Sequence, residues 1–86
     1  MNPYPPCANG SCTDRACCTP GYKYRWPNTL GMDGEKAKRI IEKDNPLVTG
    51  VIVPDGNYVI DNFCCNRVWI FVNKQGKVIL PVPMVG

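Results

Sequence analysis

Between residues 32 and 46 (MDGEKAKRIIEKDNP), apolar side chains recur three and four positions apart, which is the period of one helix face. This stripe consists of Ala37, Ile40 and Ile41. Asp33 is suited to cap the first turn, because its carboxylate can accept hydrogen bonds from the amides there. Glu35 and Arg39 can pair at four-residue spacing, and Pro46 cannot continue the helix. The pattern predicts a helix that covers a sheet.

Two other segments, residues 47–54 (LVTGVIVP) and 67–73 (RVWIFVN), are short and rich in β-branched and aromatic side chains, as strands are. Alternation along the second divides its side chains between two faces. Val68, Ile70 and Val72 lie on one face, and Trp69 and Phe71 on the other. Gln75 and Gly76 predict a turn, and residues 77–82 (KVILPV) predict an edge strand that Pro81 interrupts.

The segment from Pro54 to Asn66 connects the two best strands and is too long for a tight hairpin. Connections of this length without secondary structure are usually functional or disordered. Disorder does not suit this one, because it carries several apolar side chains and ends in two adjacent cysteines that can fix it. The apolar residues are Tyr58, Val59, Ile60 and Phe63. We expect an exposed, extended and tethered loop.

The chain has six cysteines in 86 residues. They matter for the fold, because a chain this short can hold only a small apolar core. An even number of cysteines indicates three disulfides and an oxidising compartment. Buried thiols in a reduced protein are an alternative, and so is zinc. The chain has no histidine, however, and CANGSCTDRACC lacks the repeated two-residue spacing of common zinc sites. The connectivity stays open, since six cysteines allow fifteen pairings.

Charge and length exclude several classes of protein. The net charge is +3, and the basic side chains of the predicted helix lack interleaved aromatics, so we expect a solvated face and no nucleic-acid partner. No apolar run approaches the roughly twenty residues of a membrane span. No signal-peptide pattern opens the chain, so a secreted protein is expected here in mature form. Without histidine or paired carboxylates, no acid–base catalytic site is apparent, and we expect neither enzyme activity nor a cofactor.

Four stretches carry a resemblance to a known family: RWPNTLGMDGEKAKRIIEKDNP, VIVPDGNYV, NRVWIFVN and the ending VPMVG. In this order and spacing they resemble the potato inhibitor I family of serine-protease inhibitors. The resemblance covers residues 26–86, while residues 1–25 form a cysteine-rich N-terminal arm outside it. It implies an α+β fold in which one helix packs on a small mixed sheet. A long exposed inhibitory loop lies outside that sheet, and disulfides tether the arm.

The resemblance also assigns residues to the inhibitory function. The protease-binding loop would comprise Gly56, Asn57, Tyr58, Val59, Ile60, Asp61, Asn62 and Phe63. The reactive-site bond would join Asp61 to Asn62. Arg67 matches a family arginine that donates hydrogen bonds back under the loop, with an ordinary surface strand arginine as the alternative. Metal is not implied.

Cys65 matches the position of a family cysteine that pairs with the N-terminal arm, where Cys17 or Cys18 would be its partner. From this match and from the paired cysteines at both ends, we expect Cys64 to bond another arm cysteine. Because successive side chains of an extended segment point to opposite faces, the two bonds would leave in different directions. Cys7 and Cys12 complete the set of six.

At three positions the sequence departs from the family pattern, and each departure reduces the polar support of the loop. Ile60 stands where threonine is common, Asn62 stands where an acid is common, and Trp69 replaces a second supporting arginine. The disulfides of Cys64 and Cys65 would offer a covalent substitute, since one disulfide contributes about 2–4 kcal/mol to a fold.

The function implied is substrate-like, reversible inhibition of a serine endopeptidase of subtilisin-like or chymotrypsin-like fold. Because Asp61 would enter the primary pocket, we expect a preference for proteases that cleave after acidic residues. A permissive, solvent-open pocket that tolerates Asp61 is the alternative. A different class, a disulfide-rich defence or receptor-binding protein without inhibition, would reuse the same scaffold. We expect a monomer that is secreted, either extracellular or vacuolar.

Overall fold

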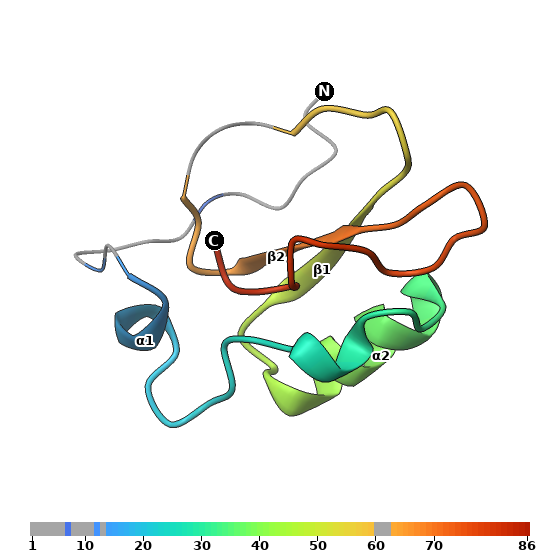
Figure 1. Cartoon of the computed structure of the whole chain (residues 1–86). Coiled ribbons are helices and arrows are strands. Elements are labelled where there is room, and N and C mark those ends of the chain that lie inside the picture. Colours follow the sequence, from blue (N-terminus) through green and yellow to red (C-terminus); the bar gives the residue numbers. More distant parts are fainter. Residues whose placement is uncertain (1–6, 8–11, 13, 60–62) are drawn as a thin grey trace.

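The computed structural model describes residues 7, 12, 14–59 and 63–86, and its elements follow the order that the pattern predicts. A short helix α1 (Arg15–Cys18) and a 3₁₀ turn (Pro27–Thr29) precede the main helix α2 (Gly34–Asp44). Strand β1 (Thr49–Val53) and strand β2 (Arg67–Phe71) follow. Helix α2 packs along the strand pair, with α1 set apart at the edge of the molecule (Figure 1). No helix among the described residues is long and apolar enough to cross a bilayer.

Strands β1 and β2 pair in parallel, in a register that runs from Thr49 opposite Arg67 to Val53 opposite Phe71. Antiparallel contacts extend this pair only as single bridges, Val72 with Val78 and Val68 with Val85. The fold is therefore the expected α+β arrangement of one helix on a small sheet of mixed direction.

The expected edge strand at residues 77–82 is wrong, because the structure forms only isolated bridges there. Lys77 pairs with Asp33 at the start of the helix, whereas Val78 pairs with Val72 beyond β2. Neighbouring residues thus face different partners, and no continuous ladder with one strand can grow. Pro81 has no amide hydrogen and cannot extend the pairing further.

Parallel pairing explains the length of the connector from Pro54 to Asn66. In a parallel pair, the chain leaves one strand at the end opposite to that at which it must enter the next. Five strand residues span about 16 Å at roughly 3.3 Å each, and the connector has to cover that distance outside the sheet. A tight turn cannot connect β1 to β2, so this topology requires an external segment.

Helix α2 begins as the sequence predicts, with Asp33 accepting a hydrogen bond from the backbone amide of Lys36 at 3.2 Å. The ion pair on the helix differs from the expected one. Lys38 Nζ lies 2.7 Å from Glu42 Oε2, and among the described residues Glu35 and Arg39 form no pair. The same Glu42 oxygen accepts a hydrogen bond from the Gly50 amide at 2.9 Å, so this pair fixes the helix to the start of β1.

The core lies between α2 and the sheet face formed by Val68, Ile70 and Val72, as alternation predicts. Its largest member is Trp26, which is fully buried and donates from Nε1 to Asp44 Oδ2 at 3.0 Å. Around it lie Ala37, Ile41, Val48, Val78 and Val85. Asn45, also fully buried, donates from its side-chain amide to the Lys23 carbonyl at 2.9 Å. This bond attaches the segment before Trp26 to the end of the helix.

Gly34 provides a stability test, because a Cβ at this position would lie 2.8 Å from Val72 Cγ1. Alanine usually favours a helix over glycine by about 1 kcal/mol, but overpacking costs about 1–3 kcal/mol. We expect Gly34→Ala to lower the free energy of unfolding, measured in guanidinium with the disulfides intact. The control Lys36→Ala, on the exposed face of the first turn, should stay within about 0.5 kcal/mol. A more stable Gly34→Ala variant would contradict the contact.

Candidate functional site

The connector leaves β1 through a tight turn. The Asn57 amide donates to the Pro54 carbonyl at 3.1 Å, and Gly56 in the third position has φ +84°. Type II turns need such a positive φ there, and glycine adopts it without strain. The chain then rises into solvent, where the Tyr58 side chain is 95% exposed. Val59 is half-buried and ends the described entry to the loop.

The expected reactive-site residues Asp61 and Asn62, together with Ile60, lie outside the described residues. Their assignment stays a prediction. What the structure places are the two segments that flank them, Gly56–Val59 on the entry side and Phe63 on the exit side.

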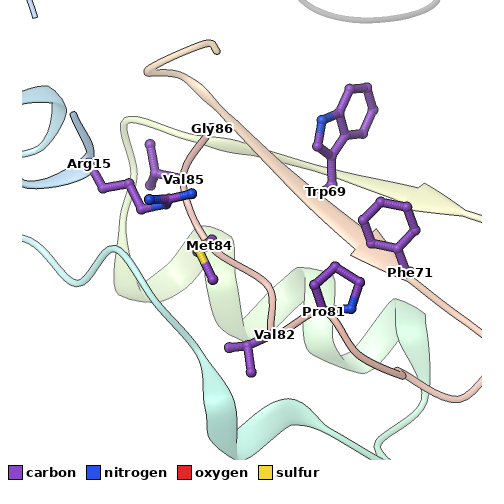
Figure 2. A pocket seen from close by; sticks show the side chains of 8 residues that line it. All are labelled: Arg15, Trp69, Phe71, Pro81, Val82, Met84, Val85 and Gly86. Carbon is purple, nitrogen blue, oxygen red and sulfur yellow. The ribbon is translucent and has the colours of Figure 1, made fainter. Parts of the chain in front are cut away.

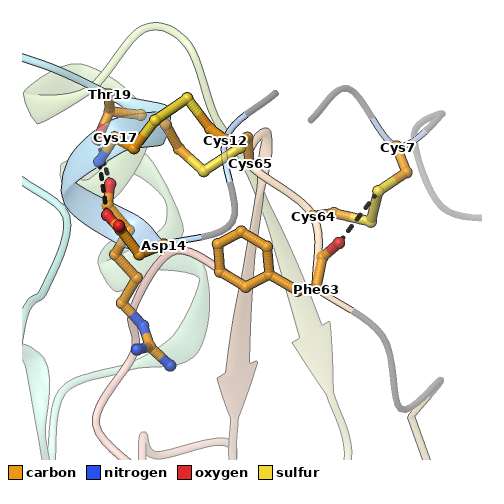
Figure 3. Close-up of a disulfide and its surroundings, with 10 residues drawn as sticks. Cys7, Cys12, Asp14, Cys17, Thr19, Phe63, Cys64 and Cys65 are labelled. Atoms are coloured by element: carbon orange, nitrogen blue, oxygen red, sulfur yellow. Dashed lines mark hydrogen bonds between the residues drawn. A yellow bond between two sulfur atoms is a disulfide. The ribbon is translucent and has the colours of Figure 1, made fainter. Parts of the chain in front are cut away.

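The exit of the loop is anchored to the N-terminal arm by two disulfides, Cys7–Cys64 and Cys18–Cys65. Both connector cysteines are buried, with exposed fractions of 2% for Cys64 and 6% for Cys65. The two bonds run from adjacent residues to different parts of the arm (Figure 3). These pairings agree with the expectation that Cys65 bonds Cys17 or Cys18 and that Cys64 bonds another arm cysteine.

Phe63 lies next to these bonds and is half-buried. Cys7 Sγ lies 3.4 Å from the Phe63 carbonyl oxygen, the contact dashed in Figure 3. A disulfide sulfur carries no hydrogen, so this is a close approach of sulfur to oxygen, not a conventional hydrogen bond. A Cβ on Gly86 would lie 3.5 Å from Cδ1 of the Phe63 ring, which places that ring beside the C-terminal segment.

The third disulfide, Cys12–Cys17, lies within the arm. It stands beside the short helix α1, whose first turn is capped by Asp14: the side chain accepts from the Cys17 amide at 2.8 Å. The Cys18 amide donates to the Asp14 carbonyl at 3.1 Å. Helix α1 therefore holds adjacent cysteines in a fixed geometry, one bonded within the arm and the other bonded to the loop exit.

All six cysteines are thus in disulfides. Neither reduced thiols nor zinc-ligating thiolates fit this arrangement. Among the described residues, no cluster of three or more metal-ligating side chains is present.

Arg67 stands at the first position of β2, directly after the loop, and is only 3% exposed. Its Nε donates to the Gly86 carbonyl oxygen at 2.9 Å, and the Gly86 amide donates to the Arg67 carbonyl at 2.9 Å. The guanidinium carbon lies 4.2 Å from the centre of the Trp69 ring, a cation–π distance. Arg67 is therefore a buried support and not a surface arginine, while its expected bonds into the loop remain a prediction.

Two parts of this support were not foreseen from the sequence. One is the stacking of Trp69 on Arg67. Its signal was available, because residues two apart on a strand share a face. The other is the position of Gly86, which pairs with Arg67 although they are far apart in sequence. That contact has no local signal and comes from the path of the C-terminal segment back along β2.

The sequence of this chain is similar to a known protein family and to individual members of it. The family model for the potato inhibitor I family matches residues 18–86. An "Inhibitor of trypsin and hageman factor" from Cucurbita maxima is 49% identical over 64 residues, covering 74% of this chain and 93% of its own. A "Glu S.griseus protease inhibitor" from Momordica charantia is 42% identical over 64 residues, with the same coverage, 74% and 93%.

A solved structure agrees with this relationship. The crystal structure of bitter gourd trypsin inhibitor superimposes with a TM-score of 0.72 at 37% identity, covering 76% of this chain and 94% of the other. The agreement of sequence and fold identifies the chain: it belongs to the potato inhibitor I family, a family of protease inhibitors and not of enzymes.

Proposed function

We propose that this chain inhibits a serine endopeptidase by presenting residues 56–63 as a substrate-like loop. The observation that carries the proposal is the connector, which has an exposed entry at Tyr58 and an exit fixed by two disulfides. A protease reads an extended backbone on both sides of the bond that it cleaves. An inhibitor gains affinity when that backbone is ordered before binding, since fixing each residue costs about 1 kcal/mol or more.

The exposure of Tyr58 supports a role in contact with a partner. An aromatic side chain buries a large area when it enters an interface, and such residues often dominate binding. With the reactive-site bond between Asp61 and Asn62, Tyr58 would lie three residues before Asp61, within reach of an enzyme cleft. Leaving this side chain 95% exposed brings the free protein no packing gain.

The choice of protease depends on Asp61, whose carboxylate would fill the primary pocket. An aspartate side chain has a reference pKa of about 3.9 and is ionised at neutral pH. An apolar pocket would strip the water from this charge without supplying a partner, at a cost of several kcal/mol. A trypsin-like pocket would set it against another carboxylate. A pocket lined with Arg, Lys or His would instead provide charge-assisted hydrogen bonds.

The proposed target is therefore an endopeptidase that cleaves after acidic residues, in an extracellular or vacuolar compartment where disulfides persist. The names of the relatives point to varied targets, trypsin for one and a Glu-directed protease for another. The Momordica charantia name supports an acidic preference within this family. A scaffold protein that binds without inhibiting is the competing function.

The direct experiment is to titrate this protein into proteases whose active-site concentration is known. A Glu-specific enzyme is compared with trypsin, chymotrypsin and subtilisin. We expect stoichiometric loss of activity with the Glu-specific enzyme. Prolonged incubation should yield a new N-terminus at Asn62, read by Edman sequencing. If none of the proteases in the panel loses activity, the competing function is favoured. Inhibition with cleavage at a different bond would retain the function and reject Asp61 as the primary residue.

Substitutions at Asp61 should move the specificity. Asp61→Lys should raise the affinity for trypsin by roughly thirtyfold or more, because leaving one charge of a buried pair without its partner costs about 2–5 kcal/mol. Asp61→Leu should raise the affinity for chymotrypsin and subtilisin, since it removes the cost of desolvating the Asp61 carboxylate. The matched control is Asp55→Leu, an exposed acid on the same connector but outside the proposed loop. Inhibition constants measure each change, and equal effects at both positions would refute the assignment.

The tether can be tested by removing one disulfide at a time. The Cys7→Ser/Cys64→Ser double variant should lose about 3 kcal/mol of stability in the chain-entropy estimate, because Cys18–Cys65 remains and the loop that Cys7–Cys64 closes then has only on the order of 12 residues. Residues 26–86 should still fold, because the core does not include that bond. We expect inhibition by the folded variant to weaken by about tenfold, or roughly 1.4 kcal/mol.

The control for this experiment is Cys12→Ser/Cys17→Ser, which removes a bond confined to the arm with a sequence separation of 5. Its inhibition constant should change by less than about threefold, within ordinary surface-mutation effects. If the folded Cys7→Ser/Cys64→Ser variant inhibits as tightly as the unmodified protein, the disulfide does not order the loop.

A further inference from the structure

A pocket of about 260 Å³ opens beside the sheet face that points away from the core. Trp69 and Phe71 of β2 line one side, and the C-terminal segment supplies Pro81, Val82, Met84, Val85 and Gly86. Figure 2 shows the two aromatic rings on one side, Arg15 on the other and the C-terminal segment between them. The side chains are apolar except for one, the cationic Arg15.

Arg15 comes from the arm, before residue 18 where the match to the family model begins. It is the first residue of α1, whose position is set by Cys12–Cys17 on one side and Cys18–Cys65 on the other. Within the part of the chain that the structure describes, the guanidinium forms neither a hydrogen bond nor an ion pair. Its Nη2 atom would lie 3.9 Å from a Cβ on Gly86, at the margin of the pocket.

This combination selects a particular chemistry. Aromatic faces and a methionine thioether favour a flat apolar body. A guanidinium without a partner among the described residues favours a carboxylate or sulfonate, which it can bind through two parallel hydrogen bonds. The volume falls just below the usual 300–1,000 Å³ of small-molecule sites, so it suits one or two rings. A polypeptide segment, with its many backbone polar groups, would find few partners on this lining.

We propose that this pocket binds a small amphipathic anion, an aromatic ring system carrying one acidic group. The ring lies against Trp69 and Phe71, and the acid faces Arg15. The arm then does more than tether the loop, since it supplies the cation that the family-matched segment lacks at this position. This site goes beyond the proposed inhibition and does not depend on the reactive-site assignment.

The test is titration of the oxidised protein with 2-naphthalenesulfonate, followed by two-dimensional ¹H–¹⁵N NMR. The chain has two tryptophans, and only Trp69 lines the pocket, whereas Trp26 is buried in the core. We expect a saturable shift of the Trp69 indole signal with little change at Trp26. The neutral 2-naphthalenemethanol should bind about tenfold more weakly, because it lacks the charge that meets Arg15.

Arg15→Gln should weaken sulfonate binding by about tenfold while binding of the neutral alcohol stays the same. The matched control is Arg25→Gln, another exposed arginine that does not line the pocket, and it should bind as the unmodified protein does. Val82→Phe, which fills the pocket, should abolish binding of both compounds. No saturation in the millimolar range, equal affinity for sulfonate and alcohol, or an unchanged Arg15→Gln affinity would each overturn the proposal.

Discussion

The parallel pairing of β1 with β2 is the constraint on which the rest of the molecule depends. It requires the chain to travel the length of a strand outside the sheet before it can pair again. In larger parallel folds a helix usually makes that crossing and covers the sheet. Here the crossing has no helix among its described residues, and α2 lies on the core side. The described entry of the crossing segment, residues 54–58, is therefore exposed, while its described exit is buried at Cys64 and Cys65.

The two ends of that segment are ordered by different means. At the entry, a turn at Pro54–Asn57 sets the direction of the chain with backbone geometry alone. At the exit, Cys64 and Cys65 are buried and cross-linked, and Arg67 below them is held between Gly86 and Trp69. Where the family pattern has more polar side chains, this chain places sulfur bonds and an aromatic ring. Covalent support of this kind does not weaken with salt, as contacts between exposed charges do.

Local pattern was sufficient for the parts of the fold that local interactions determine. The capped start of α2 and the inward face of β2 follow from Asp33 and from simple alternation, and both agree with the structure. Strand direction does not follow from local pattern, because a segment such as residues 67–73 looks the same in parallel and antiparallel pairs. The failed strand at residues 77–82 has a similar cause: its partners, Asp33 and Val72, are chosen by tertiary packing.

In the candidate site, too, some features follow from local sequence and others only from tertiary packing. Exposure at the entry of the connector, residues 54–58, was predictable from its length and flanking strands. The resemblance narrowed the partner of Cys65 to Cys17 or Cys18, but the full connectivity came only from the structure. Arg67 and Trp69 were expected to support the loop and share one face of β2, whereas the contribution of Gly86 was not predictable, since it meets Arg67 only after the C-terminal segment has returned along β2. The residues that would select a protease rest on resemblance alone, because Asp61 and Asn62 lie outside the described residues.

The disulfide connectivity also decides what hydrolysis of the backbone would leave behind. Cys7 and Cys18 precede the loop, and each is bonded to a cysteine that follows it, Cys64 or Cys65. Any single peptide bond between residues 18 and 64 can therefore be cut without dividing the protein into two molecules. The new chain ends stay joined by two independent bridges, so resealing is a unimolecular step that dilution cannot prevent. On a denaturing gel, a nicked molecule would separate into fragments only after reduction.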